Sequence, residues 1–491
     1  MASLKSLLKD TAIYGISSIA GRFVNYLLVP IETYAWVAGG GQFGVITNVY
    51  SYIGILIIAL TFGMETTFFR FANKEGENAR MVYSTALRMV GAVALVFALL
   101  VLACLKPLAA AMGYADHVWY IGTMAVCVAV DAWTAIMFDY LRYQHKPWKF
   151  MALKLANILI NVALVGAFLF VLPHFGLFIP GLYDANGTPD VGIVFYVNLF
   201  VSVVTVLLLS KEMTGVSYGF DKALCRRMLS YTWPMLILGI AGQLNQSAST
   251  IIFPYLFDGD IAEAHAQLGI YGATIKIAMI MVIITQAFRF AYEPFIFSQN
   301  RDSNKTQSYI DAMKYFIIFS MVIFLGVMFY LPILKYFIAP SYFEGLKVVP
   351  VVMLAELFFG IFFNLSLWYK LTDRTVWGMY FSLFGLAITV VVNVLLVPLI
   401  GYMGCAWGAF ASYLCMMVAS WYFGRKYYPI AYNYKNAAFY IVVAMLLYGI
   451  GNVLPLENTI LLLAARTVLL LLFLGIIVKK ETIPLPGIRR K

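Results

Sequence analysis

The stretch MVGAVALVFALLVLACL, from Met89 to Leu105, carries no charged side chain, whereas Arg88 precedes it and Lys106 follows it. About 20 apolar residues in a helix cross the hydrocarbon core of a bilayer, which is about 30 Å thick. Long basic side chains near the ends of such a helix reach the membrane surfaces. The stretch therefore predicts a transmembrane helix near residues 84–106.

Similar stretches recur along the whole chain of 491 residues, which is 63% hydrophobic and only 12% charged. Ordinary soluble domains are about 25% charged, so this composition indicates an integral membrane protein. The predicted fold class is all-α and polytopic, with about fourteen transmembrane helices. These are expected near 11–35, 43–69, 84–106, 117–140, 149–172, 191–210, 233–256, 269–297, 312–334, 348–370, 376–400, 402–423, 436–454 and 458–478.

The basic residues predict the orientation of these helices. A net charge of +11 is also typical of nucleic-acid-binding proteins, but here Lys and Arg gather at the ends of the apolar stretches, so no nucleic-acid partner is expected. If the N-terminus is cytoplasmic, the segments on that side hold about 25 of the 34 basic residues. About three lie on the other side: Lys106, Lys335 and Lys347. We therefore predict that both termini are cytoplasmic, including the basic tail KKETIPLPGIRRK.

The amino end MASLKSLLKD, followed by an apolar run, has features of a signal peptide. The run contains Arg22 and Asn25, however, continues to Pro30 and lacks a convincing small-residue cleavage site. We therefore predict a retained first helix. The five cysteines indicate neither a disulfide framework nor a CxxC metal site.

Signatures of enzymes are absent from the sequence. It contains no GxxxxGK[ST] phosphate loop, no HExxH and no GxSxG, and its four histidines are scattered without ligand spacing. The longest connections, 211–232 and 173–190, are too short for a catalytic domain. No enzymatic activity, metal or cofactor is expected, and function is expected within the helices.

Weak internal similarity indicates a duplication. GISSIAGRF in the first predicted helix matches LILGIAGQL in the seventh, and GQFG before the second matches AQLG before the eighth. Glu65 and Glu293 then fall at matching helix ends. The predicted organisation is an N-lobe over 1–210, a cytoplasmic linker over 211–232, a C-lobe over 233–423, and two extra helices with the basic tail over 424–491.

Arg289 and Glu293 lie four positions apart inside a long apolar segment, AFRFAYEPFIFS, from Ala287 to Ser298. Each charge costs roughly 3 kcal/mol near the centre of a membrane helix, so something must offset that cost or use it. Residues at i and i+4 share a helical face, so the two side chains can simply pair. The alternative is that they face a polar cavity.

Other polar residues fall within predicted membrane segments, where such side chains normally face a bundle interior or a wet cavity. Arg22 has no acid nearby on its own helix, which favours a cavity. Lys276 lies about two turns from a membrane surface, where snorkelling and a cavity position are equally compatible. The remaining intramembrane candidates are Asn25, Asp131, Asp139, Gln243, Asn245, Gln246, Glu356 and Arg466.

Four motifs carry a family resemblance: FGMETTFFRF, AFRFAYEPFIF, FFNLSLWYKLTDRT and GYMGCAWGAFASYLCMMVASWYFGRKYY. They resemble the polysaccharide-transporter branch of the multidrug/oligosaccharidyl-lipid/polysaccharide exporter superfamily, especially the Wzx-type oligosaccharide-lipid flippases of Bacteroidetes. The resemblance covers essentially the whole chain. It implies two six-helix lobes in a V around a central cavity, alternating access, and an inner-membrane location. It also implies an undecaprenyl-diphosphate oligosaccharide as cargo, from O-antigen, capsule or exopolysaccharide synthesis. A glycan polymerase and export machinery are the protein partners that such a cargo suggests.

This cargo gives the polar residues expected roles. Arginine forks suit phosphate oxygens, so Arg22 and Arg289 are predicted diphosphate contacts, with Lys276 and Arg466 as further candidates. Asn25, Gln243, Asn245 and Gln246 are predicted to line the path. Glu65 and Glu293 are predicted to pair with basic residues such as Arg70 and gate the inward mouth. Pro30 and Pro294 are predicted hinges, because proline removes a backbone hydrogen bond.

Two other functions remain open. A cation-coupled exporter of the same superfamily would use Asp131 and Asp139 to bind Na⁺ or H⁺, although such exporters usually have twelve helices and tend to carry an acid in the first helix, where this chain has Arg22. A polytopic glycan ligase or polymerase would need a sizeable outer loop, and PHFGLFIPGLYDANGTPD, from Pro173 to Asp190, is too short. The sequence leaves the coupling ion, if any, open.

Overall fold

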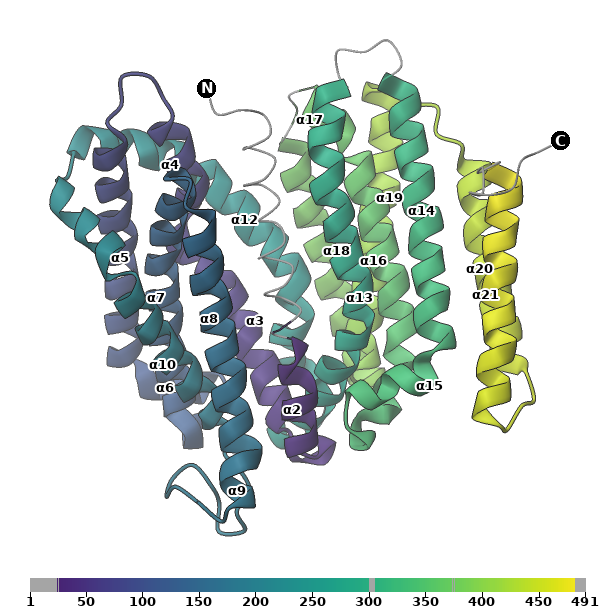
Figure 1. Cartoon of the computed structure of the whole chain (residues 1–491), viewed down its shortest axis with the longest axis horizontal. Coiled ribbons are helices and arrows are strands. Elements are labelled where there is room, and N and C mark those ends of the chain that lie inside the picture. The colour runs from purple at the N-terminus through teal and green to yellow at the C-terminus, as the bar shows by residue number, and fades with distance from the viewer. Residues whose placement is uncertain (1–23, 25, 300–304, 373, 375, 482–491) are drawn as a thin grey trace. The chain divides into compact units, whose positions relative to one another are not determined.

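The computed structural model describes residues 24, 26–299, 305–372, 374 and 376–481 (Figure 1). Over these residues the chain forms helices joined by short connections, and no β-strand is present among them. Isolated bridges join Tyr183 to Pro180 and to Pro189 in one connection. The predicted all-α fold class is therefore confirmed.

The chain divides into two compact units, Met1–Gly272 and Ala273–Lys491. The first unit contains α2 (Leu28–Ala35), α3 (Gln42–Thr61), α4 (Met64–Ala72), α5 (Ala79–Ala103), α6 (Leu105–Ala111), α7 (Val118–Tyr143), α8 (Pro147–Gly166), α9 (Leu172–His174), α10 (Gly192–Leu208), α11 (Ser210–Met213) and α12 (Lys222–Leu256). The second contains α14 (Lys305–Phe329), α15 (Leu331–Leu334), α16 (Val348–Leu365), α17 (Leu367–Leu371), α18 (Val376–Ile400), α19 (Met403–Tyr427), α20 (Tyr434–Val453) and α21 (Thr459–Glu481).

Helix α13 (Ile261–Gln299) begins in the first unit and ends in the second. The 3-10 turns are η1 (Ala38–Gly40), η2 (Ala115–His117), η4 (Thr214–Tyr218), η5 (Lys335–Phe337) and η6 (Pro340–Lys347), and η3 (Ala167–Val171) is a π-helical segment. The lobe boundary expected near 211–232 stays a prediction.

Twelve helices within the described residues are long and apolar enough to cross a membrane. A thirteenth span results if α10 and the segment Ser210–Tyr218, which meet at a bend of 66°, are counted together. Each of these matches one predicted span from the second to the fourteenth. The first predicted span, near 11–35, lies mostly outside the described residues, and α2 is its described end.

Two helix starts in the first unit, those of α5 and α12, have side-chain caps. Asn78 accepts the backbone N–H groups of Arg80 and Met81 at the start of α5, and Asp221 accepts those of Ala223 and Leu224 at the start of α12. Such caps satisfy N–H groups that have no partner within the helix. These caps determine the residue at which each of the two helices begins.

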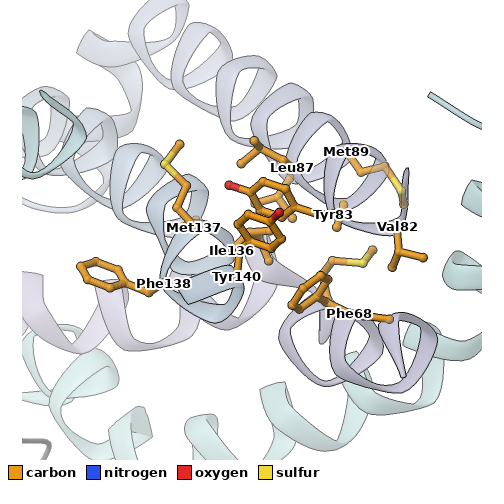
Figure 2. Close-up of a cluster of buried hydrophobic side chains, with 14 of the residues drawn as sticks. Phe68, Val82, Tyr83, Leu87, Met89, Ile136, Met137, Phe138 and Tyr140 are labelled. Carbon is orange, nitrogen blue, oxygen red and sulfur yellow. The ribbon is translucent and has the colours of Figure 1, made fainter. Parts of the chain in front are cut away.

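The core of the first unit is built around aromatic side chains from α4, α5 and α7 (Figure 2). The rings of Tyr83 and Tyr140 stack with centroids 3.8 Å apart and an interplanar angle of 8°. Phe68 meets both rings edge-on. The Tyr83 hydroxyl donates to the carbonyl oxygen of Glu212, 2.8 Å away. This cluster joins the helices near one end of the unit.

A close approach of two backbones lies elsewhere in this unit. A Cβ added at Gly44 in α3 would overlap the carbonyl oxygen of His265 in α13, and one added at Gly269 would lie 3.0 Å from the Gly44 nitrogen. Only glycine leaves this room. The two glycines occupy the matched positions of GQFG and AQLG.

Aromatic rings also dominate the core of the second unit, where α17, α18 and α19 meet. Trp377 packs against Phe423 with centroids 4.5 Å apart, and the rings of Trp368 and Tyr427 stack at 5.6 Å. The last helix, α21, is tied to α14 and to Tyr330, the residue that follows α14. The Thr467 and Tyr330 hydroxyls lie 2.7 Å apart, and Glu481 binds Lys314 at 2.7 Å.

Candidate functional site

Asp131 of α7 lies inside the first unit and bonds to a neighbouring helix. The Ser202 hydroxyl of α10 donates to its Oδ1 at 2.7 Å, and the Cys127 thiol, one turn away on α7, lies 3.8 Å from its Oδ2. A carboxylate placed among membrane helices normally has a functional or structural partner. Here the two hydrogen-bond partners are an uncharged hydroxyl and an uncharged thiol.

Side-chain hydrogen bonds continue from this point along α10. Asn157 of α8 donates to the Thr205 hydroxyl at 2.8 Å, and Asn161 of α8 donates to the Asn198 amide oxygen at 2.6 Å. Asn198 in turn donates to the Tyr50 hydroxyl of α3. We call this set the polar ladder; it comprises Tyr50, Asp131, Asn157, Asn161, Asn198, Ser202 and Thr205.

The α8 and α10 members of the polar ladder were not among the residues predicted from the sequence. Their spacing was a usable signal, because Asn198, Ser202 and Thr205 occupy positions i, i+4 and i+7 of an otherwise apolar helix, and Asn157 and Asn161 are four apart. Such spacing places side chains on one helical face. Two apolar helices with matching polar faces predict contact between those faces.

Lys154 of α8 brings a positive charge to the same region. Its Nζ lies 4.1 Å from the centroid of the Phe138 ring, and it interacts electrostatically with Asp131, Glu65 and Asp139. Asp139 is buried and binds Arg142 at 3.3 Å, while its Oδ2 lacks a hydrogen-bond partner among the described residues.

The two predicted cation-binding acids do not form one site. Asp131 and Asp139 are eight residues apart on α7, which separates them by about 12 Å along the axis. Only Asp131 bonds to the polar ladder. Over the described residues, no three or more His, Cys, Asp or Glu side chains gather in a way that suits a metal ion.

The predicted path residues of α12 differ in exposure. Gln243 donates to the Ser247 hydroxyl at 2.9 Å and lies against Gly54 of α3, whereas Asn245 is buried and Gln246 is exposed. Nearby, the Thr250 hydroxyl donates to that of Ser51 in α3 at 2.6 Å. The seam between α3 and α12 is therefore polar, and Gln246 lies off it.

The predicted gate residues of the first unit are exposed. The Arg70 guanidinium stacks over the Tyr231 ring, with its carbon 4.0 Å from the centroid, and Glu65 lies five residues earlier on α4, about one and a half turns away. Pro30 is the third residue of α2, where a proline costs the helix little. Their roles as gate and hinge stay predictions.

Most of the remaining predicted residues lie outside the described part of the chain or have side chains outside it. Arg22 and Asn25 lie outside the described residues, and Arg289, Glu293 and Pro294 belong to α13 but their side chains lie outside the description. Lys276 is half-buried in α13.

Arg466 lies in the second unit, on α21. It donates to three neutral oxygens: the carbonyls of Gly451 at 3.1 Å and Phe329 at 3.3 Å, and the Asn452 side chain at 3.4 Å. Positive charge at helix C-termini is favourable. Arg466 therefore joins the ends of α14 and α20, a role that the sequence did not indicate.

No protein-family model matches the chain, and no curated protein does either. Among solved structures, the lipid II flippase MurJ in an inward closed conformation matches with a TM-score of 0.72 and 13% identity, over 97% of this chain and 100% of that one. An inward-facing multidrug resistance MATE family transporter of the MOP superfamily matches with a TM-score of 0.61 and 15% identity, over 85% of this chain and 94% of that one. An outward-facing one matches with a TM-score of 0.56 and 14% identity, over 85% and 95%.

At these identities the likeness establishes the fold. The chain has the fold of MurJ and of the MATE transporters, and these neighbours are transporters and flippases rather than enzymes. The resemblance expected from the motifs is thus confirmed at the level of the superfamily's fold.

Proposed function

We propose that this protein flips a polyprenyl-diphosphate-linked oligosaccharide from the cytoplasmic to the periplasmic leaflet of the bacterial inner membrane by alternating access. The observation that carries the proposal is the extent of the structural match. The MurJ structure, a lipid II flippase, accounts for 97% of this chain, whereas the MATE structures account for 85%. A flippase fold therefore explains more of the chain than an exporter fold does.

The chemistry of the cargo supports the same choice. A diphosphate sugar cannot cross about 30 Å of hydrocarbon unassisted, because its charges and hydroxyls would lose their water. Guanidinium groups replace that water with bidentate hydrogen bonds. In the proposed mechanism Arg22 and Arg289 bind the diphosphate, Lys276 assists, and Gln243 and Asn245 form the polar lining.

Glu293 has a matching role in the proposal. When the site is empty it pairs with Arg289 one turn away, and it releases the arginine when the diphosphate arrives. Glu65 and Arg70 act at the inward mouth, and Pro30 and Pro294 let their helices bend. Wzx-type cargo from O-antigen, capsule or exopolysaccharide synthesis fits this arrangement.

The decisive experiment measures access to the sugar in proteoliposomes. Purified protein is reconstituted with labelled undecaprenyl-diphosphate oligosaccharide, and a membrane-impermeant glycosidase reports the label that reaches the outer leaflet. We expect cleavage beyond the initially exposed fraction only with active protein. Unchanged protection, with native cargo and an imposed ion gradient, would contradict the proposal.

Variants separate binding from structural pairing. Arg289→Ala should abolish flipping while expression persists, and Arg425→Ala, which removes an arginine from the end of α19, is the matched control. If Arg289 and Glu293 only pair with each other, the exchanged variant Arg289→Glu/Glu293→Arg should regain activity. Diphosphate binding by Arg289 predicts instead that the exchanged variant stays inactive.

A cation-coupled exporter is the second candidate, and Asp131 is the observation that favours it. A carboxylate held by Ser202 and Cys127 among apolar helices can bind Na⁺ or H⁺ as these ions move. Asp131→Asn should then abolish efflux of small molecules driven by an ion gradient in the same proteoliposomes. Sugar flipping without such efflux would exclude this candidate.

A further inference from the structure

The second unit contains a cationic pocket of about 390 Å³ where α14 ends, α16 begins, α20 ends and α21 begins. This volume is within the range of small-ligand sites. Three basic residues line it, Lys335, Lys347 and Arg466, together with Tyr448 and Asn452. We name it the helix-end pocket. Its apolar wall consists of Met328, Leu331, Pro332, Leu346 and Pro350.

The charge of the helix-end pocket is unbalanced. Among the described residues, none of its three cations lies within 4 Å of a carboxylate oxygen, and the lining contains no acid. The neighbouring Glu344 instead accepts the Tyr402 hydroxyl at 3.2 Å. Three cations within one concave surface repel one another, so a bound anion would stabilise the site.

The two lysines are held by aromatic rings. Lys335 Nζ lies 5.2 Å from the Tyr336 centroid and 5.0 Å from that of Phe343, and Lys347 Nζ lies 5.0 Å from that of Tyr402. A ring face attracts the ammonium without neutralising it. The lysines are thereby positioned at the pocket while their full charge remains.

Arg466 keeps donor capacity for a ligand. A guanidinium has five N–H groups, and its three hydrogen bonds go to neutral oxygens at the ends of α14 and α20. These bonds hold the group rigidly at the pocket wall. Tyr448 adds a hydroxyl, and its ring is fixed edge-on against Phe324 with centroids 5.4 Å apart.

The sequence pattern gives an independent reason to regard the cations as functional. Under the predicted orientation only about three basic residues lie on the outer side, Lys106, Lys335 and Lys347. Two of these three line the helix-end pocket. Exposed Ile333 and Tyr336 flank it, as expected at a membrane surface.

From these observations we propose that the helix-end pocket binds a phosphate group at the outer membrane surface. Three cations and a hydroxyl donate to the phosphate oxygens, and the apolar wall accommodates the start of an acyl or prenyl chain when the phosphate belongs to a lipid. This binding does not depend on the proposed flipping activity, because the pocket lies entirely within the second unit.

Native mass spectrometry of protein released from nanodiscs tests the proposal. The discs contain phosphatidylcholine alone or with phosphatidylglycerol, and a separate series adds inorganic pyrophosphate to protein in phosphatidylcholine. The test variant is Lys335→Gln/Lys347→Gln. The matched control is Lys435→Gln/Lys479→Gln, which removes the same charge where α20 begins and α21 ends. Arg466→Lys provides a milder change that keeps the charge.

We expect a retained phosphate-bearing ligand on the wild type and on the control. The test variant should bind it about tenfold or more weakly, because each basic residue near an anionic surface contributes about a factor of five. If the test variant loses only the phosphatidylglycerol adducts, the bound phosphate belongs to a lipid. If it loses the pyrophosphate adducts, the bound phosphate belongs to a soluble ligand. Equal retention of both ligands by test variant and control overturns the proposal.

Discussion

Asparagine side chains in the interiors of the two units form different kinds of hydrogen bond. In the first unit, buried polar groups bond from helix to helix: Asn161 to Asn198, and Asp131 to Ser202. In the second, Asn364 of α16 and Asn393 of α18 donate to carbonyls four residues earlier in their own helices, at 3.0 and 2.7 Å. Side chains that bond across helices specify which helices meet, whereas those that bond back to their own helix do not. The asparagines of the polar ladder thus help to specify which helices meet in the first unit, whereas these bonds of Asn364 and Asn393 do not do so in the second.

Gly44→Val should have the largest effect. The added side chain would overlap the His265 carbonyl, so α3 and α13 must separate, at a cost of about 3 kcal/mol in the free energy of unfolding. The measurement is alkylation of the buried thiols during heating, with Cys127 reporting on the first unit and Cys405 on the second. We expect earlier alkylation of Cys127. Gly326→Val, where an added Cβ meets nothing within 4 Å, is the control.

Lys149→Met should cause the second-largest loss of stability. Lys149 Nζ lies 2.7 Å from a carboxylate oxygen of Glu212, which is buried, so the change strands a buried charge. Because Lys149 is one-third exposed, we expect a loss of about 2 kcal/mol, below the range for fully buried pairs. The double variant Lys149→Met/Glu212→Met should recover most of it in the same thiol assay. A double variant no better than the single one would argue against a pairwise origin.

Asn198→Leu and Asn364→Leu compare the two interiors directly. The first leaves the Asn161 amide and the Tyr50 hydroxyl without the partners they have in the structure, and should cost about 1 kcal/mol. The second removes a buried amide oxygen that has no hydrogen-bond partner among the described residues, and should be neutral or stabilising. If Asn198→Leu lowers the protection of Cys127 as much as Asn364→Leu lowers that of Cys405, the two kinds of asparagine contribute equally to stability.

Protonation of Asp184 should have the smallest effect, because it should destabilise only the connection that contains this residue. Backbone N–H groups of Thr188 and Asn186 donate to its carboxylate and hold its pKa below the usual range. A depressed folded pKa stabilises the connection above the ordinary carboxyl pKa of about 3.9, and this stabilisation is lost as pH falls through the folded pKa. Amide exchange of residues 184–190 should therefore become faster, relative to Asp184→Asn, only at acidic pH.

The fold was predictable because a helix that crosses the membrane needs about 20 mostly apolar residues. The described helices match the predicted spans from 43–69 onward, including breaks as short as that between Ile400 and Met403. Apolar length alone carries this information. Apolar length does not predict the 66° bend between α10 and α11, although the hydropathy falls where the bend lies, from Leu209 to Ser210 and Lys211.

The candidate site was predictable only in part. Rare charges such as Asp131 are visible in an apolar sequence, but their partners are common residues such as Ser202, whose role depends on which helices pack together. Arg466 illustrates the limit, because two of its three acceptors are backbone carbonyls of α14 and α20, which no sequence pattern identifies. Gly44 and Gly269 were found through the internal repeat, yet their close packing required the structure.

Helix α12 has 35 residues, so it is about 52 Å long and exceeds the hydrocarbon thickness by about 20 Å. Its start at Lys222 bears Arg226 and Arg227, and Arg227 pairs with Glu77 of the connection before α5. A rod of this length works as a lever. A tilt of about 10° at the part that lies within the hydrocarbon thickness displaces the protruding end by about 3 Å, a movement that distance measurements between spin labels can detect.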